Sequence, residues 1–367
     1  MILLHTSDWH LGRMLYSKKE RSDEHAKFLS WLLDTVKKNA VDTLIVAGDI
    51  FDSAAPGNAA QKMYYDFLLG AHNCGCRNIV VVAGNHDSPS LLDAPKEILS
   101  ALNIKIVGKI TENPEDEIVV IDDENGETAA IICAVPFLRE RDIIRFVEGE
   151  KYADRSKRIA ENVRKHYETL AEIAENKRTE TGKNIPVIAT GHLSVAGGKR
   201  SDDDGVHDTY IGTIEMLGSD IFPKTFDYVA LGHFHIPSIT GDNNKIRYCG
   251  SPIPMGFGEA KQQKIAVLVD FEKDTITEIH IPCFQKLKSI CGDKKFIFNC
   301  LSELKKQKES IWVEIIYEGK EVFPDLSVWV NELIANTKIE IIKLQNRQYL
   351  TEVLTQNDSE QSLNELD

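Results

Sequence analysis

The chain has 367 residues, of which 42% are hydrophobic and 27% are charged, and its formal net charge is −14. This composition is that of a globular protein that can bury a core without disulfide staples, and the length predicts one large domain with a smaller one. The acidic charge argues against a domain that binds nucleic acid by bulk electrostatics alone, because such domains are usually basic.

Cysteine usage and hydropathy indicate the compartment. The seven cysteines contain no CxxC pair, which indicates a reduced, cytosolic protein rather than a disulfide framework. The start lacks the basic region of a signal peptide, and no stretch approaches the roughly 18 apolar residues of a membrane span. We therefore expect a soluble, cytoplasmic protein with no membrane partner.

Buried strands alternate with amphipathic helices over the first two thirds of the chain. Apolar, β-branched runs predict strands within 1–6, 42–48, 78–84, 186–191 and 227–232, and helical periodicity predicts helices over 24–39, 58–73 and 158–177. Strands that are apolar throughout are buried on both faces, so we expect an α/β fold, a β-sandwich flanked by helices. Consecutive strands within 245–250, 262–272 and 275–282 would complete a sheet.

A second pattern begins at residue 283. Strands are predicted at 286–292, 311–318 and 339–345, with helices at 296–309 and 325–337 between them. This βαβαβ unit predicts a small second domain. We therefore expect a first domain over 1–282, a second over 283–345, and a polar, acidic tail over 346–367 that is either frayed or part of a truncated partner-binding segment.

Five of the apolar runs end in residues that can bind metal, each beside a glycine or a tight turn. In chain order these are Asp8 with His10, then Asp49, then Asn85 with His86 and Asp87, then His192, and last His233 with His235. Each motif alone has an ordinary explanation, as a turn or a structural histidine. The carboxyl ends of parallel strands meet at one crevice, so we expect the five ends to converge.

The donor set predicts a site for two metal ions. Seven side chains, Asp8, His10, Asp49, Asn85, His192, His233 and His235, are more than one zinc ion takes and enough for two ions with water. Mixed oxygen and nitrogen ligands without a thiolate favour manganese, iron or zinc. Asp49 is the candidate bridging carboxylate, and a pair of ions can activate water and hold a phosphate in line.

These motifs resemble those of a known family. The set DxH, GDxxD, GNHD, GH and GHxH is similar to the signature of calcineurin-like metallophosphoesterases. More narrowly, the stretches HTSDWHLG, ICAVPFLRERDI, YIG and RYCGSPIP resemble the SbcD family of bacterial nuclease subunits. The resemblance implies the calcineurin-like β-sandwich, with the βαβαβ unit as a capping domain that binds DNA.

The resemblance also implies a role for each site residue. Asp8, His10, Asp49 and His235 would hold one ion and Asp49, Asn85, His192 and His233 the other, with Mn²⁺ favoured over Mg²⁺. His86 would face the scissile phosphate as a catalytic residue, with Asp87 orienting its imidazole; the alternative is that His86 only makes a supporting hydrogen bond. Asp52 would hold its loop rather than the metal.

The implied function is a metal-dependent DNA nuclease. It would act as a 3'-5' double-strand exonuclease and a single-strand or hairpin endonuclease, processing DNA ends and hairpins at the nucleoid in repair, recombination and replication. The implied partner is an SbcC-type, SMC-like ATPase, bound by a homodimer of this chain within a heterotetramer. No GxxxxGK[ST] motif occurs, so ATP hydrolysis would come from the partner.

Two other functions stay open at this point. One is a phosphoesterase for small molecules or phosphoproteins on the same dinuclear scaffold, which the acidic charge favours slightly. The other is a non-catalytic scaffold, which the intact donor set argues against.

Two sets of side chains have a functional and an ordinary interpretation. Apolar residues on the helices around GNHD either form a homodimer contact or face their own sheet; they are Met63, Tyr64, Phe67, Leu68, Leu91 and Leu92. Basic clusters either contact a phosphate backbone or lie on solvated faces; they are Arg139, Arg141 and Arg145, then Arg155, Lys157 and Arg158, then Lys199 and Arg200.

Overall fold

The computed structural model describes residues 1–145, 147–199, 216–241, 244–321 and 323–346. The tail expected after residue 346, Arg200 and the YIG stretch at 210–212 lie outside these ranges. The chain forms two compact units: Met1–Arg13, Glu20–Met255 and Gln262–Pro282 make the first, and Met14–Lys19, Gly256–Lys261 and Cys283–Asp367 make the second.

The first unit contains two sheets packed face to face. The first sheet runs, in spatial order, β14 (Thr275–His280), β13 (Ile265–Asp270), β1 (Ile2–Thr6), β4 (Thr43–Ala47), β5 (Asn78–Val82) and β6 (Ile104–Val107). The second runs β11 (Ser238–Ile239), β12 (Ile246–Tyr248), β10 (Tyr228–Gly232), β9 (Val187–His192), β8 (Thr128–Cys133) and β7 (Ile118–Asp122). Apolar side chains from both sheets form the core between them, which confirms the predicted sandwich.

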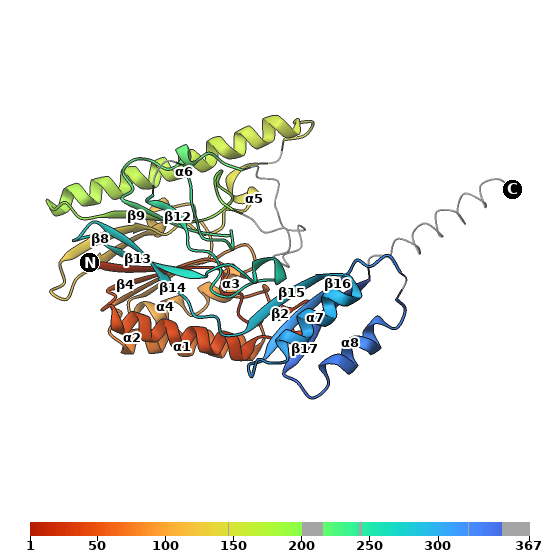
Figure 1. The fold of residues 1–367 in the computed structure, drawn as a ribbon. Helices are drawn as coiled ribbons and strands as arrows, with labels where there is room; N and C mark the ends of the chain where they lie inside the picture. Colours follow the sequence, from red (N-terminus) through yellow and green to blue (C-terminus); the bar gives the residue numbers. More distant parts are fainter. Residues whose placement is uncertain (146, 200–215, 242–243, 322, 347–367) are drawn as a thin grey trace. The chain divides into compact units, whose positions relative to one another are not determined.

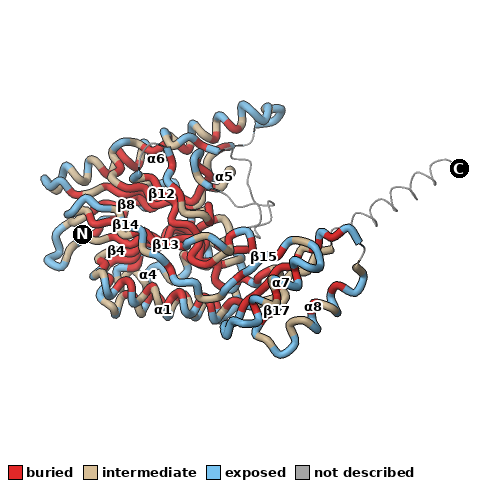
Figure 2. The backbone as a smooth tube through the Cα atoms, in the orientation of Figure 1, coloured by how far each residue is buried: buried red, intermediate tan, exposed pale blue. Residues whose placement is uncertain are grey.

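Helices cover the outer faces of this sandwich. The helices are α1 (Ser22–Lys38), α2 (Asn58–Asn73), α3 (Pro89–Asp93), α4 (Lys96–Ser100), α5 (Glu140–Ile143) and α6 (Tyr152–Thr181), with 3-10 turns η1 (Pro114–Glu117) and η3 (Ser219–Ile221). Figure 1 shows α6 along the second sheet and α1 with α2 on the opposite side of the unit. Figure 2 shows the buried backbone concentrated in the strands between these helices.

Strand direction decides where the functional loops meet. Strand β1 pairs in parallel with β4, β4 with β5, and β9 with β10. Their carboxyl ends therefore open toward one edge of each sheet. Strands β13 and β14 are antiparallel additions beside β1, as expected for consecutive strands without a crossover helix.

The second unit has a parallel sheet with the order β15-β16-β17. Its elements are β15 (Lys286–Gly292), α7 (Lys294–Leu304), β16 (Ile311–Tyr317), α8 (Leu326–Ile334) and β17 (Ile339–Asn346), together with η4 (Phe257–Glu259), while β2 (Met14–Leu15) pairs with β3 (Lys19–Glu20). Asp293 begins α7 by accepting a hydrogen bond from the Phe296 backbone N–H at 2.7 Å. The βαβαβ order matches the sequence pattern.

Two short segments of the second unit, Met14–Lys19 and Gly256–Lys261, come from earlier in the chain than its sheet. Leu15 and Phe257 pack in an apolar cluster with Leu287, Trp312 and Ile342, on strands of the three-stranded sheet. The two short segments that carry Leu15 and Phe257 are distant in sequence from that sheet, so the local pattern at 286–345 did not reveal them.

The apolar side chains proposed for a dimer contact mostly face their own unit. Tyr64, Phe67, Leu68 and Leu92 are buried within the single chain, whereas Met63 and Leu91 are half-buried. The alternative, that these residues serve the core, is therefore correct for four of the six. None of the helices in the described ranges is long and apolar enough to cross a membrane.

Helix α2 offers a matched test of this core assignment. Phe67 is buried and lies edge-on to Trp9 with ring centroids 5.1 Å apart, while Leu69 on the same helix is 51% exposed. Phe67→Ala should lower the free energy of unfolding by about 3–5 kcal/mol because it leaves a cavity. Leu69→Ala should change it by about 0.5 kcal/mol or less. Urea unfolding followed by circular dichroism measures both, and equal losses would contradict the assignment.

Candidate metal centre

The polar residues that follow five parallel strands lie together in one buried site. Strands β1, β4 and β5 of the first sheet and β9 and β10 of the second each deliver part of it. Short polar contacts connect all of the predicted donors to one another: Asp8, His10, Asp49, Asn85, His192, His233 and His235. The expected convergence of the strand ends is thus present in the fold.

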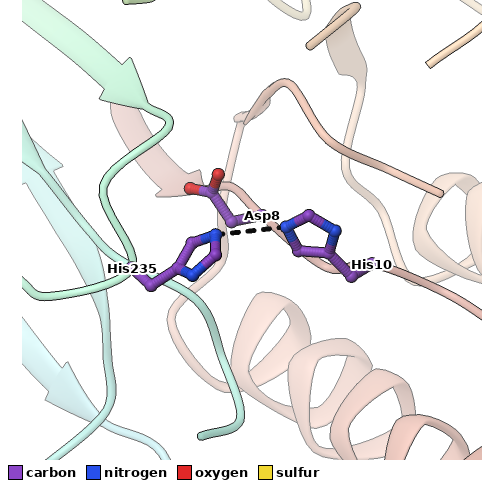
Figure 3. A group of neighbouring side chains, drawn as sticks. All are labelled: Asp8, His10 and His235. Atoms are coloured by element: carbon purple, nitrogen blue, oxygen red, sulfur yellow. Dashed lines mark hydrogen bonds between the residues drawn. The ribbon is translucent and has the colours of Figure 1, made fainter. Parts of the chain in front are cut away.

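One half of the site is formed by Asp8, His10 and His235. The Nε2 atoms of His10 and His235 are 3.2 Å apart, and Figure 3 shows the carboxylate of Asp8 beside the two rings. One ligand atom from each of the three residues lies within 4.8 Å of the others. This spacing is that of a shared coordination sphere.

The other half is built around Asp49 and Asn85. His192 Nε2 lies 3.2 Å from Asp49 Oδ2 and 3.0 Å from Asn85 Oδ1, and His233 Nδ1 lies 3.2 Å from the same amide oxygen. The Nδ1 atom of His192 donates to the Ala47 carbonyl at 2.9 Å, because a carbonyl can only accept. When His192 is neutral, this hydrogen bond keeps the proton on Nδ1 and leaves Nε2 as the ligand atom. His10 Nε2, 3.6 Å from Asp49 Oδ2, joins the two halves.

The backbone at these strand ends is left-handed. Asp8, His10, Asp49 and His233 have φ values of 52°, 46°, 50° and 103°, which L-residues rarely adopt. Gly84 makes the close approach possible, because a Cβ there would overlap the Asp49 carboxylate. Non-glycine residues persist in such conformations where the surrounding structure holds them and function needs their side chains.

Burial and mutual charge shift the protonation of the site. Burial by itself lowers the pKa of His192, but the carboxylates of Asp49 and Asp8 raise it to about 9. Burial and the charge of Asp49 raise the pKa of Asp8 to about 7, although His192 opposes the shift. Burial by itself would raise the pKa of Asp49. The imidazoles of His192 and His10 outweigh this effect and hold the pKa well below the usual range. The site thus concentrates negative charge on Asp49, which a cation can neutralise.

His86 lies beside this cluster and is held by the loop that follows β4. Its backbone N–H donates to Asp49 Oδ1 at 2.9 Å, and its Nδ1 donates to the Asp52 carbonyl at 3.0 Å. The rings of His86 and His10 are edge-on, with centroids 4.9 Å apart. Because Nδ1 is used by Asp52, Nε2 is the nitrogen left for a substrate.

The expected role of Asp87 in orienting His86 is wrong. The Asp87 carboxylate is turned inward and accepts backbone N–H groups of Gly84, Ile50 and Phe51 at 2.8, 3.2 and 3.0 Å. The orienting contact to His86 comes from the Asp52 carbonyl instead. Asp87 ties the loop after β5 to the loop after β4, and burial, with the charge of Asp49, raises its pKa to about 6.

Asp52 also supports a predicted metal ligand. Its carboxylate lies 3.4 Å from His10 Nδ1 and accepts a hydrogen bond from Arg13 Nη1 at 2.9 Å. A carboxylate behind a ligating imidazole fixes the ring and raises its basicity. The carboxylate of Asp52 thus lies against His10, and its backbone carbonyl accepts a hydrogen bond from His86.

Other supporting residues escaped the sequence analysis. Arg13 pairs with Asp52, Ser7 Oγ donates to Asp8 Oδ2, and Lys264 Nζ donates to the His235 carbonyl at 3.0 Å. Ser7 and Arg13 flank the DxH motif, so their position in the sequence could have indicated a supporting role. Lys264 is 29 residues beyond His235, and nothing in the sequence indicates its contact with that residue.

The chemistry of these donors fits divalent metal ions. The cluster offers imidazole nitrogens, carboxylate oxygens and an amide oxygen, and three groups of its residues each bring three ligand atoms within 4.8 Å of one another, one of which includes His86. Such a mixed nitrogen and oxygen set suits Mn²⁺, Fe²⁺ or Zn²⁺. The buried carboxylates of Asp8 and Asp49 also need a positive charge to compensate them.

Comparisons with known proteins cover both units. Residues 1–237 match the family model described as Calcineurin-like phosphoesterase, and residues 283–367 match the model described as Type 5 capsule protein repressor C-terminal domain. The SbcD component of the nuclease SbcCD from Escherichia coli strain K12 is 33% identical over 371 residues, which cover 100% of this chain and 90% of that protein. Proteins of the same name from Rhodobacter capsulatus and Bacillus subtilis are each 32% identical, covering 77% and 74% of this chain and 69% and 66% of theirs.

The contact between Asp52 and His10 gives a prediction about metal affinity. Asp52→Asn removes the negative charge behind the imidazole while preserving its shape, so Mn²⁺ affinity should fall by about 10- to 100-fold. Calorimetric titration of Mn²⁺ into the metal-free full chain measures the effect.

The matched control is Asp66→Asn, on the exposed face of α2, where the carboxylate is 63% exposed and pairs with Lys62. This variant should bind Mn²⁺ as the unchanged chain does. An Asp52→Asn variant with unaltered affinity would show that Asp52 does not support a ligand.

Proposed function

The chain belongs to the calcineurin-like phosphoesterase family and, within it, to the SbcD family, and on that premise we propose that it is a metal-dependent DNA nuclease. The proposed reactions are 3'-5' exonuclease cleavage of double strands and endonuclease cleavage of single strands and hairpins. The relatives that are 32% to 33% identical carry the name of a nuclease component. The proposed setting is the processing of DNA ends and hairpins in repair, recombination and replication, in the cytoplasm at the nucleoid.

One observation carries this proposal: His86 Nε2 lies beside a cluster of metal-type donors and makes no hydrogen bond to the residues that the structure describes. The backbone N–H of His86 donates to Asp49, and the ring lies against His10. Because Nδ1 donates to the Asp52 carbonyl, Nε2 is the ring nitrogen that can meet a substrate. A phosphodiester bound at the cluster would therefore meet Nε2 of His86. This arrangement suits hydrolysis of a phosphate ester.

The proposed ligand sets divide the cluster in two. Asp8, His10, Asp49 and His235 would hold one ion, and Asp49, Asn85, His192 and His233 the other. The short contacts within each set support this division. We favour Mn²⁺, with Mg²⁺ as the alternative, because the sets mix nitrogen and oxygen donors and contain no thiolate.

The residues of the chain would divide the reaction between them. Bound divalent ions supply Lewis acidity and lower the pKa of water. Asp49 and Asn85 orient the imidazoles around them, and the left-handed strand ends keep these donors aimed at one point. With a proton on both ring nitrogens, His86 would keep Nδ1–H on the Asp52 carbonyl and either donate its Nε2 proton to the leaving oxygen or stabilise the charge that develops on the phosphate. Asp52 keeps the His86 ring in that orientation.

The remaining assignments concern domains and partners. We propose a nuclease domain over 1–282, a DNA-binding capping domain over 283–345, and a tail over 346–367. The proposed assembly is a homodimer of this chain bound to an SbcC-type, SMC-like ATPase. The family model matched at 283–367 supports a distinct C-terminal domain.

The substrate class is tested with the purified chain and Mn²⁺. Linear duplex and hairpin DNA should be cut, while nucleotides and phosphopeptides should be hydrolysed far more slowly. Gel assays and phosphate release measure the two rates. Rapid phosphate release without DNA cleavage would favour the alternative phosphoesterase for small molecules or phosphoproteins.

The role of His86 is tested separately. His86→Ala should lower DNA cleavage by about 100-fold or more, because it removes general acid catalysis, while Mn²⁺ affinity stays unchanged. His280→Ala, at an exposed position of β14, is the control and should affect neither. Loss of Mn²⁺ affinity in His86→Ala would mean that His86 is a ligand.

A further inference from the structure

We propose that Arg139 binds a phosphate of the DNA backbone next to the scissile phosphate. The inference rests on the proposed nuclease function and adds a substrate contact to it. The basic cluster that contains Arg139 was open to two interpretations from sequence, and the structure separates its members.

The segment that carries Arg139 is fastened to the site. It follows β8, and Thr190 Oγ1 donates to the Val135 carbonyl at 2.9 Å. The Phe137 backbone N–H donates to the Ala83 carbonyl at 2.8 Å, and the Phe137 ring lies edge-on to His192 with centroids 6.3 Å apart. The segment is therefore held at the carboxyl ends of β5 and β9, where the predicted metal ligands lie.

The guanidinium of Arg139 reaches the loop that carries His86. Its Nη2 donates a long hydrogen bond of 3.4 Å to the Asp87 carbonyl. The Asp87 carboxylate accepts hydrogen bonds from the backbone N–H groups of Gly84, Ile50 and Phe51 and forms no ion pair with Arg139 in the described ranges. A half-buried positive charge thus stands one residue from His86.

Arg139 differs from its neighbouring arginines Arg155 and Arg158, which are each paired with a carboxylate. Glu140, its neighbour, pairs with Arg155, and Arg158 pairs with Glu150. Within the ranges that the structure describes, no carboxylate forms an ion pair with Arg139. A guanidinium that contacts the Asp87 carbonyl, next in the chain to His86, and has no carboxylate paired with it in the described ranges fits an anionic ligand.

The chemistry of that ligand follows from the donor and its place. A guanidinium presents several N–H donors in a fixed fork that matches phosphate oxygens. Contacts to backbone phosphates position a protein on DNA without reading its sequence. Because Arg139 lies on the Asp87 side of His86, it fits the phosphate that neighbours the one being cleaved.

The experiment compares a long and a short substrate. The full chain with Mn²⁺ is assayed on duplex DNA and on bis(p-nitrophenyl) phosphate, which has one phosphate and no neighbour. Arg139→Ala should lower DNA cleavage at least tenfold, and that loss should exceed the loss on the small diester by at least fivefold. The slope of log binding constant against log salt should fall by about 1.

Two variants control for charge and folding. Arg141→Ala removes the same charge from a side chain that is 79% exposed in the same segment, and both rates should stay within twofold of the unchanged chain. Arg139→Lys should recover part of the DNA activity, because lysine supplies the charge without the fork. It also keeps the test valid if Arg139→Ala does not fold.

A neutral methylphosphonate placed at successive positions of the DNA locates the contact. A methylphosphonate at one position next to the cleaved bond should slow DNA cleavage by the unchanged chain but not by Arg139→Ala. Equal losses on both substrates, or Arg139→Ala cutting DNA as Arg141→Ala does, would overturn the inference and leave the nuclease function intact. If the unchanged chain hydrolyses the small diester but cuts no DNA, the nuclease function fails and the inference fails with it.

Discussion

Two carboxylates enclosed where β1 and β4 end are the constraint on which the site depends. Asp8 and Asp49 are buried, and an ionised carboxylate away from water is stable only when it is hydrogen-bonded and compensated by positive charge. Asp49 receives the His86 backbone N–H on one oxygen and faces His192 and His10 with the other. The Asp8 carboxylate receives the His233 N–H and the Ser7 hydroxyl. These contacts supply hydrogen bonds and imidazole partners to the two buried carboxylates.

The backbone meets that need at a local conformational cost. Left-handed φ values at Asp8, Asp49 and His233 turn these polar side chains toward the site just after each strand ends. Such conformations cost on the order of 1–3 kcal/mol each and persist only when neighbouring structure determines them. The Asp87 carboxylate supplies part of that determination, because it binds backbone N–H groups from two loops at once. The sandwich beneath provides the rest, since the five strands that end at the site are buried along nearly their whole length: β1, β4, β5, β9 and β10.

The loop after β4 connects metal binding with catalysis. Asp52 contacts His10 through its carboxylate and His86 through its carbonyl. Its partner Arg13 is nearly buried, so this part of the loop is held from behind. A displacement of Asp52 would therefore disturb a candidate ligand and a candidate acid together. Arg139 lies on the other side of His86, toward Asp87.

The sequence by itself predicted the sandwich, the βαβαβ unit and the set of residues that meet at the strand ends. These features are local: apolar runs of strand length mark buried strands, and glycine beside a polar residue marks the turn that follows. The motif at Asp8 and His10 had an ordinary loop interpretation when taken alone. Its agreement with four similar strand ends made a shared site the better explanation.

Only the tertiary structure decided which atoms touch. His10 and His235 are 225 residues apart, and the 3.2 Å between their nitrogens depends on how the two sheets pack. The same packing assigned the orienting contact of His86 to the Asp52 carbonyl and turned Asp87 inward, which the order of residues in GNHD could not reveal. Spacing along a strand specifies the face on which a side chain lies. Hydrogen-bond partners between separate loops follow only when those loops have been placed in space.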